Sequence, residues 1–265
     1  MSATGAASSL QRKPGFAVAA RLGHAVNGLL HLLIGVIAFR LATGGGGEAD
    51  QSGALGSIAG SPGGRVLLWI IVVGLLGLGL WQLVETVLAR GEDAKRTWAA
   101  RAKELGKAVA YLAIAFTALR FAMGGSSDSS EQTQSLSARL LAAPGGVALL
   151  VVLGLAVVAV GVYFGFKGAT KRFQDDISVP SGSLGRGITA LGVAGYIAKG
   201  VALVAVGVLF VVGAVTADPS RATGLDGALQ ALAALPAGVA VLAVTGLGLI
   251  AYGLYCGARA RYAKL

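Results

Sequence analysis

The sequence predicts an all-α integral membrane protein with six transmembrane helices, built as three copies of one helical hairpin. Three observations support this fold class. The 265-residue chain is 55% hydrophobic and only 13% charged, whereas soluble domains carry about 25% charged residues. Six apolar stretches are each long enough to cross a bilayer, and glycines and prolines recur at equivalent positions along the chain.

The six apolar stretches set the helix boundaries that the sequence predicts. A hydrocarbon core about 30 Å thick requires about 20 apolar residues in a helix. The stretches cover residues 22–42, 64–88, 105–123, 145–168, 189–215 and 237–257. The first follows basic residues, as a signal peptide would, but it recurs inside the chain, so we expect a retained helix.

Lys and Arg residues predict the orientation. Most of the 22 basic residues fall in segments 1–27, 81–107, 164–199 and 256–265. Basic residues concentrate in cytoplasmic loops, so both termini are expected in the cytoplasm of a multi-pass protein of the cell (plasma) membrane. The net charge of +10 is explained in this way, together with attraction to anionic lipid, and a nucleic-acid partner is not expected.

Internal repeats divide the chain into a tail and three hairpins. The tail covers residues 1–20, and the repeats cover 21–90, 101–170 and 187–261. Their first helices align Asn27 with Lys107 and Lys199, and their second helices align after Pro62-Gly-Gly, Pro144-Gly-Gly and Pro236-Ala-Gly. Each copy begins on the same side of the membrane, so the repeats are parallel, and three of them predict a pseudo-threefold bundle.

The outer loops are expected to contain short amphipathic helices. The segments that begin at Ser52, Ser135 and Asp226 each start with a residue suited to an N-cap and run towards the shared proline. Each proline is then expected at or near the first turn of the next transmembrane helix, where its missing N–H costs nothing.

These motifs resemble a family of bacterial membrane proteins catalogued as domain of unknown function 1206. The resemblance rests on a basic residue before a small one in the first helix (Lys107-Ala108 and Lys199-Gly200) and on Pro-x-Gly before the second helix. It extends from about Arg21 to Arg261, and repeat one departs from it with Asn27. The resemblance implies the architecture and no activity.

Polar residues on the first helix of each hairpin form a candidate vestibule. The i, i+3, i+7 spacing places each set on one helix face. The set comprises His24, Asn27, His31, Glu104, Lys107, Tyr111, Tyr196 and Lys199. One interpretation is a vestibule, open to the cytoplasm, that binds an ion, a proton or a lipid head group. The other is that these groups lie near the interface, where lysines snorkel and Glu104 pairs locally.

Two further sets are candidates for positions at the membrane surface. The second helices end on the cytoplasmic side with aromatic and charged residues: Trp81, Glu85, Tyr163, Lys167, Tyr255 and Arg259. These residues fit an aromatic belt with interface anchors, and the charges could also pair between repeats. Arg40 and Arg120 lie at the outer ends of their helices, where a cation complements the helix dipole.

Cofactors, metals and catalytic residues are not expected. His24 and His31 lie about 10 Å apart along one helix and cannot be the two axial ligands of one haem iron. Cys256 is the only cysteine and is expected to be a packing residue. Three functions remain open: a non-enzymatic scaffold or accessory subunit, a small conduit or transporter lined by the vestibule, and an intramembrane enzyme. The expected partners are membrane lipids and a partner membrane protein or a second copy of the chain.

Overall fold

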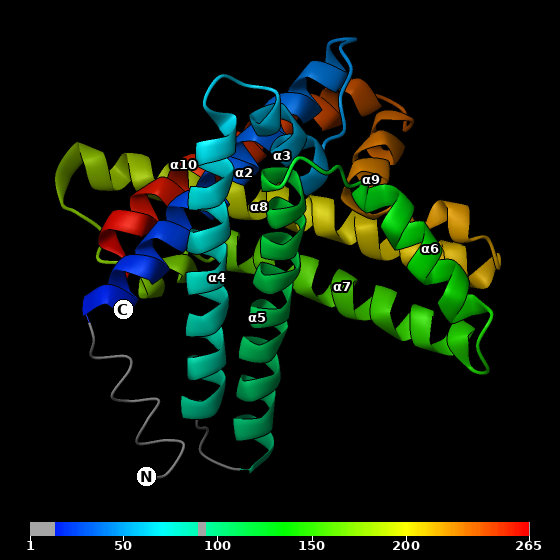
Figure 1. Cartoon of the computed structure of the whole chain (residues 1–265), viewed down its shortest axis with the longest axis horizontal. Coiled ribbons are helices and arrows are strands. Elements are labelled where there is room, and N and C mark those ends of the chain that lie inside the picture. Colours follow the sequence, from blue (N-terminus) through cyan, green and yellow to red (C-terminus); the bar gives the residue numbers. More distant parts are fainter. Residues whose placement is uncertain (1–13, 90–93, 265) are drawn as a thin grey trace. The chain divides into compact units, whose positions relative to one another are not determined.

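The computed structural model describes residues 14–89 and 94–264, which are almost entirely helical (Figure 1). The long helices are α2 (Pro14–Ala42), α4 (Gly64–Leu88), α5 (Ala94–Ala122), α7 (Gly146–Ala169), α8 (Gly182–Val215) and α10 (Gly238–Tyr262). The short elements are α3 (Gln51–Ala59), α6 (Ser129–Leu141), α9 (Gly224–Ala233), and the 3₁₀ turns η1 (Arg172–Asp176) and η2 (Pro219–Arg221). Within these described residues, six helices are long and apolar enough to cross a membrane, which confirms the predicted fold class.

Three long helices begin earlier than the apolar pattern predicts. The first helix of each hairpin starts at Pro14, Ala94 and Gly182 instead of near residues 22, 105 and 189. Hydropathy marks the part of a helix that matches the hydrocarbon core, whereas the backbone hydrogen bonds continue into polar sequence. The 34 residues of α8 extend over about 51 Å, which is longer than a core of about 30 Å.

The chain forms two compact units, and their boundaries cut across the hairpins. The first unit contains the described residues up to Asn27, Leu55–Ser126, and those from Cys256 onward. Its main contact is α4 against α5, which lie side by side (Figure 1). The second unit contains Gly28–Ala54 and Ser127–Tyr255. Its main contact is α7 against α8, and α6, α9 and the two 3₁₀ turns pack on this pair.

Equivalent glycines support three crossings between the second helix of one repeat and the first helix of another. A Cβ atom on Gly161 of α7 would lie 2.8 Å from the Gly200 carbonyl oxygen of α8. One on Gly253 of α10 would lie 2.6 Å from the Gly28 carbonyl oxygen of α2. One on Gly79 of α4 would lie 2.8 Å from Leu112 Cδ2 of α5. Each of the three glycines also meets the aligned residue Leu32, Leu112 or Val204, so the same repeat positions meet at all three junctions, and each junction lies within one unit.

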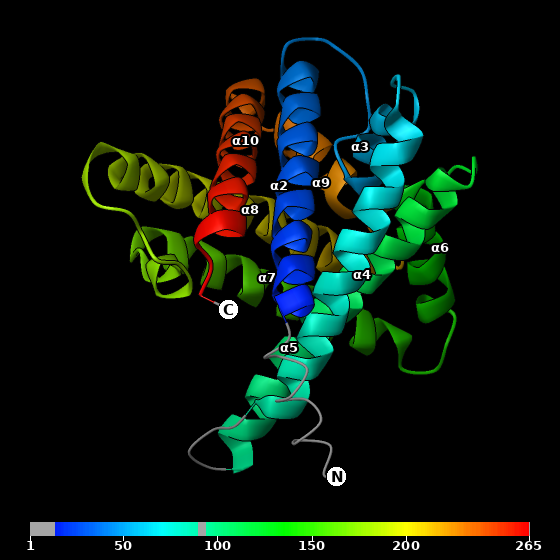
Figure 2. The ribbon, with the colours of Figure 1, turned by 60° about the vertical axis from the view of Figure 1, so that its left-hand side comes forward.

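The α2–α10 junction joins the last repeat to the first. The two helices lie side by side in both views (Figures 1 and 2). Within the second unit, the Gly35 and Gly246 backbones approach so closely that a Cβ atom on Gly35 would lie 2.6 Å from the Gly246 carbonyl oxygen. Within the first unit, the Arg21 guanidinium donates to the carbonyl oxygens of Ala260 at 3.3 Å and Arg261 at 2.5 Å. This cation meets the last carbonyls of α10, where the helix dipole favours it.

The three short helices of the outer loops are present, but their predicted starts were wrong. The Asp50 carboxylate accepts the Gly53 N–H at 2.9 Å and caps α3, and Asp128 likewise accepts the Glu131 N–H at 2.9 Å and caps α6. Helix α9 follows Thr223, whose side chain makes no cap hydrogen bond. Ser52, Ser135 and Asp226 are thus inside the helices, because carboxylates or backbone turns earlier in each loop start them.

The Pro-x-Gly segments form a tight turn between each short helix and the next long one. Their middle residues have left-handed backbone angles, with φ of 75° at Gly63, 75° at Gly145 and 59° at Ala237. The prolines therefore lie two residues before the helix start. The last glycine of each segment presses on the preceding short helix: a Cβ atom on Gly64, Gly146 or Gly238 would overlap a carbonyl oxygen of that helix.

The outward faces of the long helices are apolar. On α7, Val152, Leu155 and Val162 are 62%, 55% and 58% exposed, and only 17% of the most apolar window of this helix is buried inside the structure. An exposed helix face made of several large apolar side chains marks an interface with lipid or with protein. The exposed surface of α7 therefore fits the hydrocarbon core of a membrane.

Candidate functional site

The second unit contains a group of rings that we call the aromatic cluster. Its members are Phe164 on α7, Phe173 on η1, Tyr196 on α8, and Tyr252 and Tyr255 on α10. Phe173 stacks on Tyr196 with ring centroids 5.3 Å apart and meets Tyr255 edge-on at 5.2 Å, and Tyr196 meets Tyr252 edge-on at 5.3 Å. These separations and tilts are those at which aromatic pairs attract.

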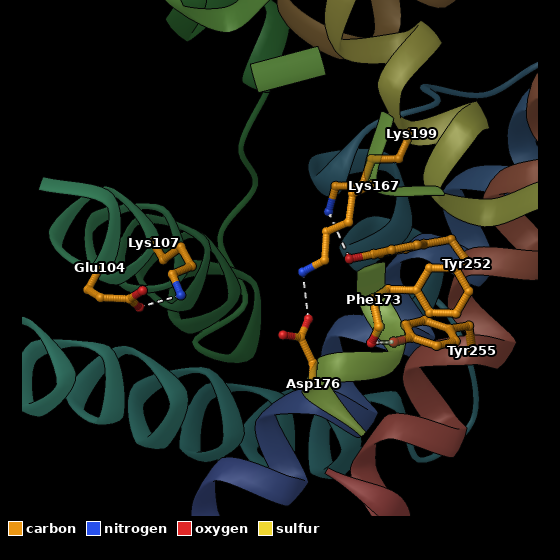
Figure 3. Close-up of polar contacts among 8 residues, drawn as sticks. All are labelled: Glu104, Lys107, Lys167, Phe173, Asp176, Lys199, Tyr252 and Tyr255. Carbon is orange, nitrogen blue, oxygen red and sulfur yellow. Dashed lines mark hydrogen bonds and ion pairs between the residues drawn. The ribbon is translucent and has the colours of Figure 1, made fainter. Parts of the chain in front are cut away.

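The loop after α7 delivers the central ring of this cluster. Phe173 is completely buried. Its ring packs against Gly192 of α8, where a side chain would leave no room for it, because a Cβ atom on Gly192 would lie 2.5 Å from Phe173 Cζ. The Tyr255 hydroxyl donates to the Phe173 carbonyl oxygen at 3.3 Å (Figure 3). The short turn η1 is therefore fixed to α8 through its ring and to α10 through its backbone.

Lys199 extends into the cluster from α8. Its Nζ lies 4.4 Å from the centre of the Tyr252 ring and 5.3 Å from that of Phe164. It also donates to the Tyr252 hydroxyl at 3.4 Å (Figure 3). The His31 ring of α2 packs on Tyr252, with centroids 4.8 Å apart. Ring faces attract a cation electrostatically, so these contacts reduce the cost of placing an ammonium group among apolar helices.

Lys167 is held at the edge of the same cluster. Its Nζ bonds Asp176 Oδ2 of η1 at 2.6 Å and lies 5.5 Å from the centre of the Tyr196 ring. The two charged side chains are 13% and 30% exposed, so the pair is shielded more than a surface ion pair. This pair ties the end of α7 to η1 and gives the cluster a second cation.

The first unit contains the remaining polar residues of the candidate vestibule. Glu104 and Lys107 form an ion pair one turn apart on α5 (Figure 3). The Asn27 side-chain amide donates to Cys256 Sγ at 3.5 Å, and both residues are buried. His24 is also buried, and Tyr111 is half-buried on α5.

The predicted vestibule set is thus divided between the two units. His24, Asn27, Glu104, Lys107 and Tyr111 belong to the first unit, and His31, Tyr196 and Lys199 belong to the second. Within the second unit, Tyr252 joins the last three, because it contacts each of them.

The predicted interface set occupies different environments. Tyr163 is 46% exposed on α7, whereas Trp81 and Tyr255 are 7% and 0% exposed. Glu85, Lys167 and Arg259 are half-buried. Tyr255 therefore packs in the interior of the second unit, because α8 and η1 cover the face of α10 that carries it.

Sequence reasoning missed Tyr252 and Phe173. Tyr252 aligns with Leu78 and Val160 in the other repeats, and this exchange of an aliphatic residue for a tyrosine is a signal that could have been noticed. Phe173 lies in a loop between basic and acidic residues, where no periodicity indicates that it is buried.

A second group of polar residues lies in the second unit, around the start of α3 and on α9. The Asp226 carboxylate accepts the Ala49 N–H at 2.8 Å and the Gln230 amide at 2.7 Å. Asp50 is nearby and almost fully buried. Burial, together with the negative charges of Asp226 and Glu48, raises the pKa of Asp50 to about 6, although the Gly53 N–H opposes this. Burial and the charges of Asp128 and Asp226 also raise the pKa of Glu48.

Metal ligands do not gather in the residues that the structure describes. No three His, Cys, Asp or Glu side chains among residues 14–89 and 94–264 are placed to hold a metal ion. The acidic side chains of the outer loops accept backbone and amide N–H groups instead, and so stabilise the ends of short helices.

Two cavities in the second unit lie along α8. One, of about 680 Å³, is lined by Lys171 just before η1, by the loop after η1 and by the first part of α8, including Arg186. The other, of about 480 Å³, is lined by apolar residues of α7, α8 and α9. None of the candidate vestibule side chains lines either cavity.

Comparison with known sequences assigns the family. The profile described as Domain of Unknown Function (DUF1206) matches residues 22–89, 103–171 and 194–263. The chain belongs to this family. The DUF1206 repeats coincide with the three pairs of long helices, which confirms the threefold repetition and the predicted resemblance.

A curated relative extends over nearly the whole DUF1206 chain. The chain is 33% identical over 252 residues to a protein of Bacillus subtilis (strain 168) named "Uncharacterized protein YxxB". The match covers 92% of this chain and 90% of the relative. No solved structure matches the chain.

Proposed function

We propose that this DUF1206 protein is a non-enzymatic scaffold or accessory subunit of the plasma membrane that binds lipid or a partner membrane protein. The observation that carries the proposal is the environment of Lys199. Its ammonium group lies over two aromatic rings and donates to the Tyr252 hydroxyl. A charge that serves a conduit or a reaction has to face water or substrate, whereas this one faces rings that fix helices α7, α8 and α10 together.

The other membrane-depth polar groups support the same function. Asn27 donates to Cys256, Glu104 pairs with Lys107, and Lys167 pairs with Asp176. Each pair joins groups within one unit, and buried polar groups with internal partners contribute to a unique packing. The exposed surface of α7 is apolar, which suits contact with lipid or with another membrane helix.

The orientation is part of the proposal. Lys171, Arg172 and Arg186 lie between α7 and the body of α8, and Arg259 and Arg261 lie in the last turns of α10. Basic residues on one side predict that this side is cytoplasmic and that both termini lie there. A reporter fused to the C-terminus that is active only outside the cell would contradict this orientation.

Extraction without detergent tests the scaffold function. The full chain, carrying an affinity tag, is extracted in polymer-bounded native membrane discs and purified, and its lipids and proteins are identified by mass spectrometry. We expect a stoichiometric partner protein or a lipid enriched over the bulk membrane. Discs that contain the chain alone, with lipid of bulk composition, would overturn the proposal.

A further inference from the structure

The two cavities of the second unit share one face of α8. The first is lined by Arg186, Ala190 and Val193, and the second by Ile197, Val201 and Val204. These positions follow one another at intervals of three or four residues. Such residues lie above one another on a helix with 3.6 residues per turn. The cavities therefore follow one another along the same face of α8, and we call the two together the α8 groove.

One end of the α8 groove is basic. Lys171 and Arg186 are both exposed and line the cavity of about 680 Å³ together with Thr189. The Thr189 oxygen accepts from the Gln174 amide at 2.9 Å, a bond that leaves the hydroxyl proton as a donor. The nearby carboxylate of Asp176 is bound by Lys167. Two cations and a hydroxyl therefore gather at this end of the groove.

The rest of the groove is apolar. In the cavity of about 480 Å³, the α7–α8 crossing contributes Gly161, Gly165 and Gly200, and aliphatic side chains of both helices form the walls. Leu232 and Leu235, on and just after α9, also line this cavity. A Cβ atom on Gly165 would meet nothing within 4 Å, so the space above this residue is open.

The length of the groove matches the membrane. The axial distance from Arg186 to Val208 is about 33 Å at 1.5 Å per residue, which is close to the hydrocarbon thickness of about 30 Å. With the apolar part of α8 in the hydrocarbon core, Lys171 and Arg186 lie at head-group depth. They lie on the side where basic residues concentrate, and the anionic lipids of the cytoplasmic leaflet attract such residues.

We propose that the α8 groove binds an anionic phospholipid. Lys171 and Arg186 bind the phosphate and the negative head group, and an acyl chain runs along Ala190, Val193 and Ile197 towards Gly165. The charge at one end and the apolar lining beyond it match the two halves of such a lipid. This inference rests on the proposed scaffold function and names a ligand class for it.

Two substitutions test the two ends of the groove separately. Lys171→Gln with Arg186→Gln removes the charges, and the matched control is Lys95→Gln with Lys103→Gln, two exposed lysines of α5. Gly165→Leu fills the apolar part, where a Cβ atom meets open space. Its control is Gly106→Leu on α5, where a Cβ atom also meets nothing within 4 Å.

The measurement is native mass spectrometry of the purified full chain with added phosphatidylglycerol or phosphatidylcholine. We expect one bound phosphatidylglycerol, preferred by about tenfold, a difference of about 1.4 kcal/mol. The glutamine pair is expected to lose the preference, Gly165→Leu to lose binding of both lipids, and both controls to behave as wild type. Equal binding of the two lipids by wild type, or loss of the preference in the α5 control, would overturn the site.

A second outcome would assign the groove to protein. A wild-type dimer that Gly165→Leu, but not Gly106→Leu, converts to a monomer would mean that a helix of a second copy occupies the groove, and the lipid site would be wrong. The scaffold function fails separately, because it is tested by partners and lipids retained in native discs. A chain without lipid preference that still retains a partner protein disproves only the lipid site.

Discussion

At the residue scale, the middle position of the Pro-x-Gly turns shows what an internal repeat preserves and what it relaxes. Gly63, Gly145 and Ala237 all have positive φ, a conformation in which a Cβ atom crowds the following carbonyl and costs about 1–2 kcal/mol. Repeat three therefore carries a strained alanine at a position where the other repeats have glycine. The next residue is glycine in all three repeats, and no larger residue fits there, because an added Cβ atom would overlap a carbonyl oxygen.

This strain gives a prediction for a pair of opposite substitutions. Ala237→Gly relieves the left-handed alanine and is expected to raise the free energy of unfolding by about 0.5–1 kcal/mol, since the entropy of the unfolded glycine offsets part of the relief. Gly145→Ala creates the same strain in repeat two and is expected to lower it by about 1 kcal/mol. Unfolding by SDS in mixed micelles measures both, and shifts in the same direction would contradict this explanation.

Asp50 places a titrating group in the loop just before α3. Burial is the main reason why its pKa rises from 3.8 to about 6, and Asp226 and Glu48 add to it. A carboxyl group with a raised pKa binds its proton more tightly in the folded chain than in the unfolded chain. The contribution of Asp50 to stability therefore falls as the pH rises from about 4 to about 6 and changes little above that interval, with a total loss of about 3 kcal/mol.

Asp50→Asn tests this pH dependence. The asparagine oxygen still accepts the Gly53 N–H that caps α3, but it carries no charge at any pH. We expect the variant to be as stable as wild type near pH 4, and more stable above about pH 7. The thermal unfolding midpoint across this range measures the difference. A variant that keeps the wild-type slope would show that another group, such as Glu48 with its raised pKa, causes it.

At the scale of elements, the helix crossings depend on which glycines face a neighbouring backbone. Gly161 and Gly165 lie one turn apart on α7 and the backbones of both approach Gly200 of α8, yet only a Cβ atom on Gly161 would meet α8. Its Cβ atom would lie 2.8 Å from the Gly200 carbonyl oxygen and from the Val204 nitrogen, whereas that of Gly165 meets open space. The two positions therefore separate the effect of helix contact from the effect of helix propensity.

Gly161→Ala and Gly165→Ala form a matched pair. The first is expected to push α7 away from α8 and to lower the free energy of unfolding by about 1–3 kcal/mol. The second replaces glycine by a better helix former and is expected to be neutral or stabilising by up to about 1 kcal/mol. Denaturation in mixed micelles compares them. Equal losses would mean that close contact at Gly161 is not what holds this junction.

The sequence predicted the helices well because their signals are local. The apolar stretches and the Pro-x-Gly turns act within a few residues. The helix starts were predicted less well, because the polar first turns of α2, α5 and α8 carry no hydropathy signal. Lys103 of repeat two aligns with Gly23 and Gly195 of the other repeats. Those two glycines leave room for Leu78 and Tyr252 of the neighbouring helices, and Lys103 does not. The difference between the repeats is visible in the sequence, but the contact that depends on it is visible only in the fold.

The candidate site was predictable only in part. Lys199 and His31 stood out because charged or polar residues are rare among apolar helices. Their partners did not, because Tyr252 is 53 residues from Lys199 and Phe173 lies in an irregular loop. A sequence pattern identifies which side chains need partners, whereas the fold determines whether those partners are rings, water or a ligand.

At the scale of the whole molecule, the choice is between a scaffold and a conduit. A conduit requires polar side chains that line a wet path, and the cavities along α8 are lined mainly by apolar residues with two basic residues at one end. The membrane-depth polar groups bond or stack within their own units. The three equivalent glycine junctions supply a packing framework that the family repeats three times in one chain.

Ion flux through liposomes that contain the purified full chain is the most direct test of this account. A pH-sensitive dye inside the vesicles reports proton entry under a potassium diffusion potential. A scaffold predicts the same rate as vesicles without protein, for wild type and for His31→Leu and Lys199→Met alike. A protein-dependent proton flux that either substitution abolishes would contradict the scaffold and assign the protein to the conduits.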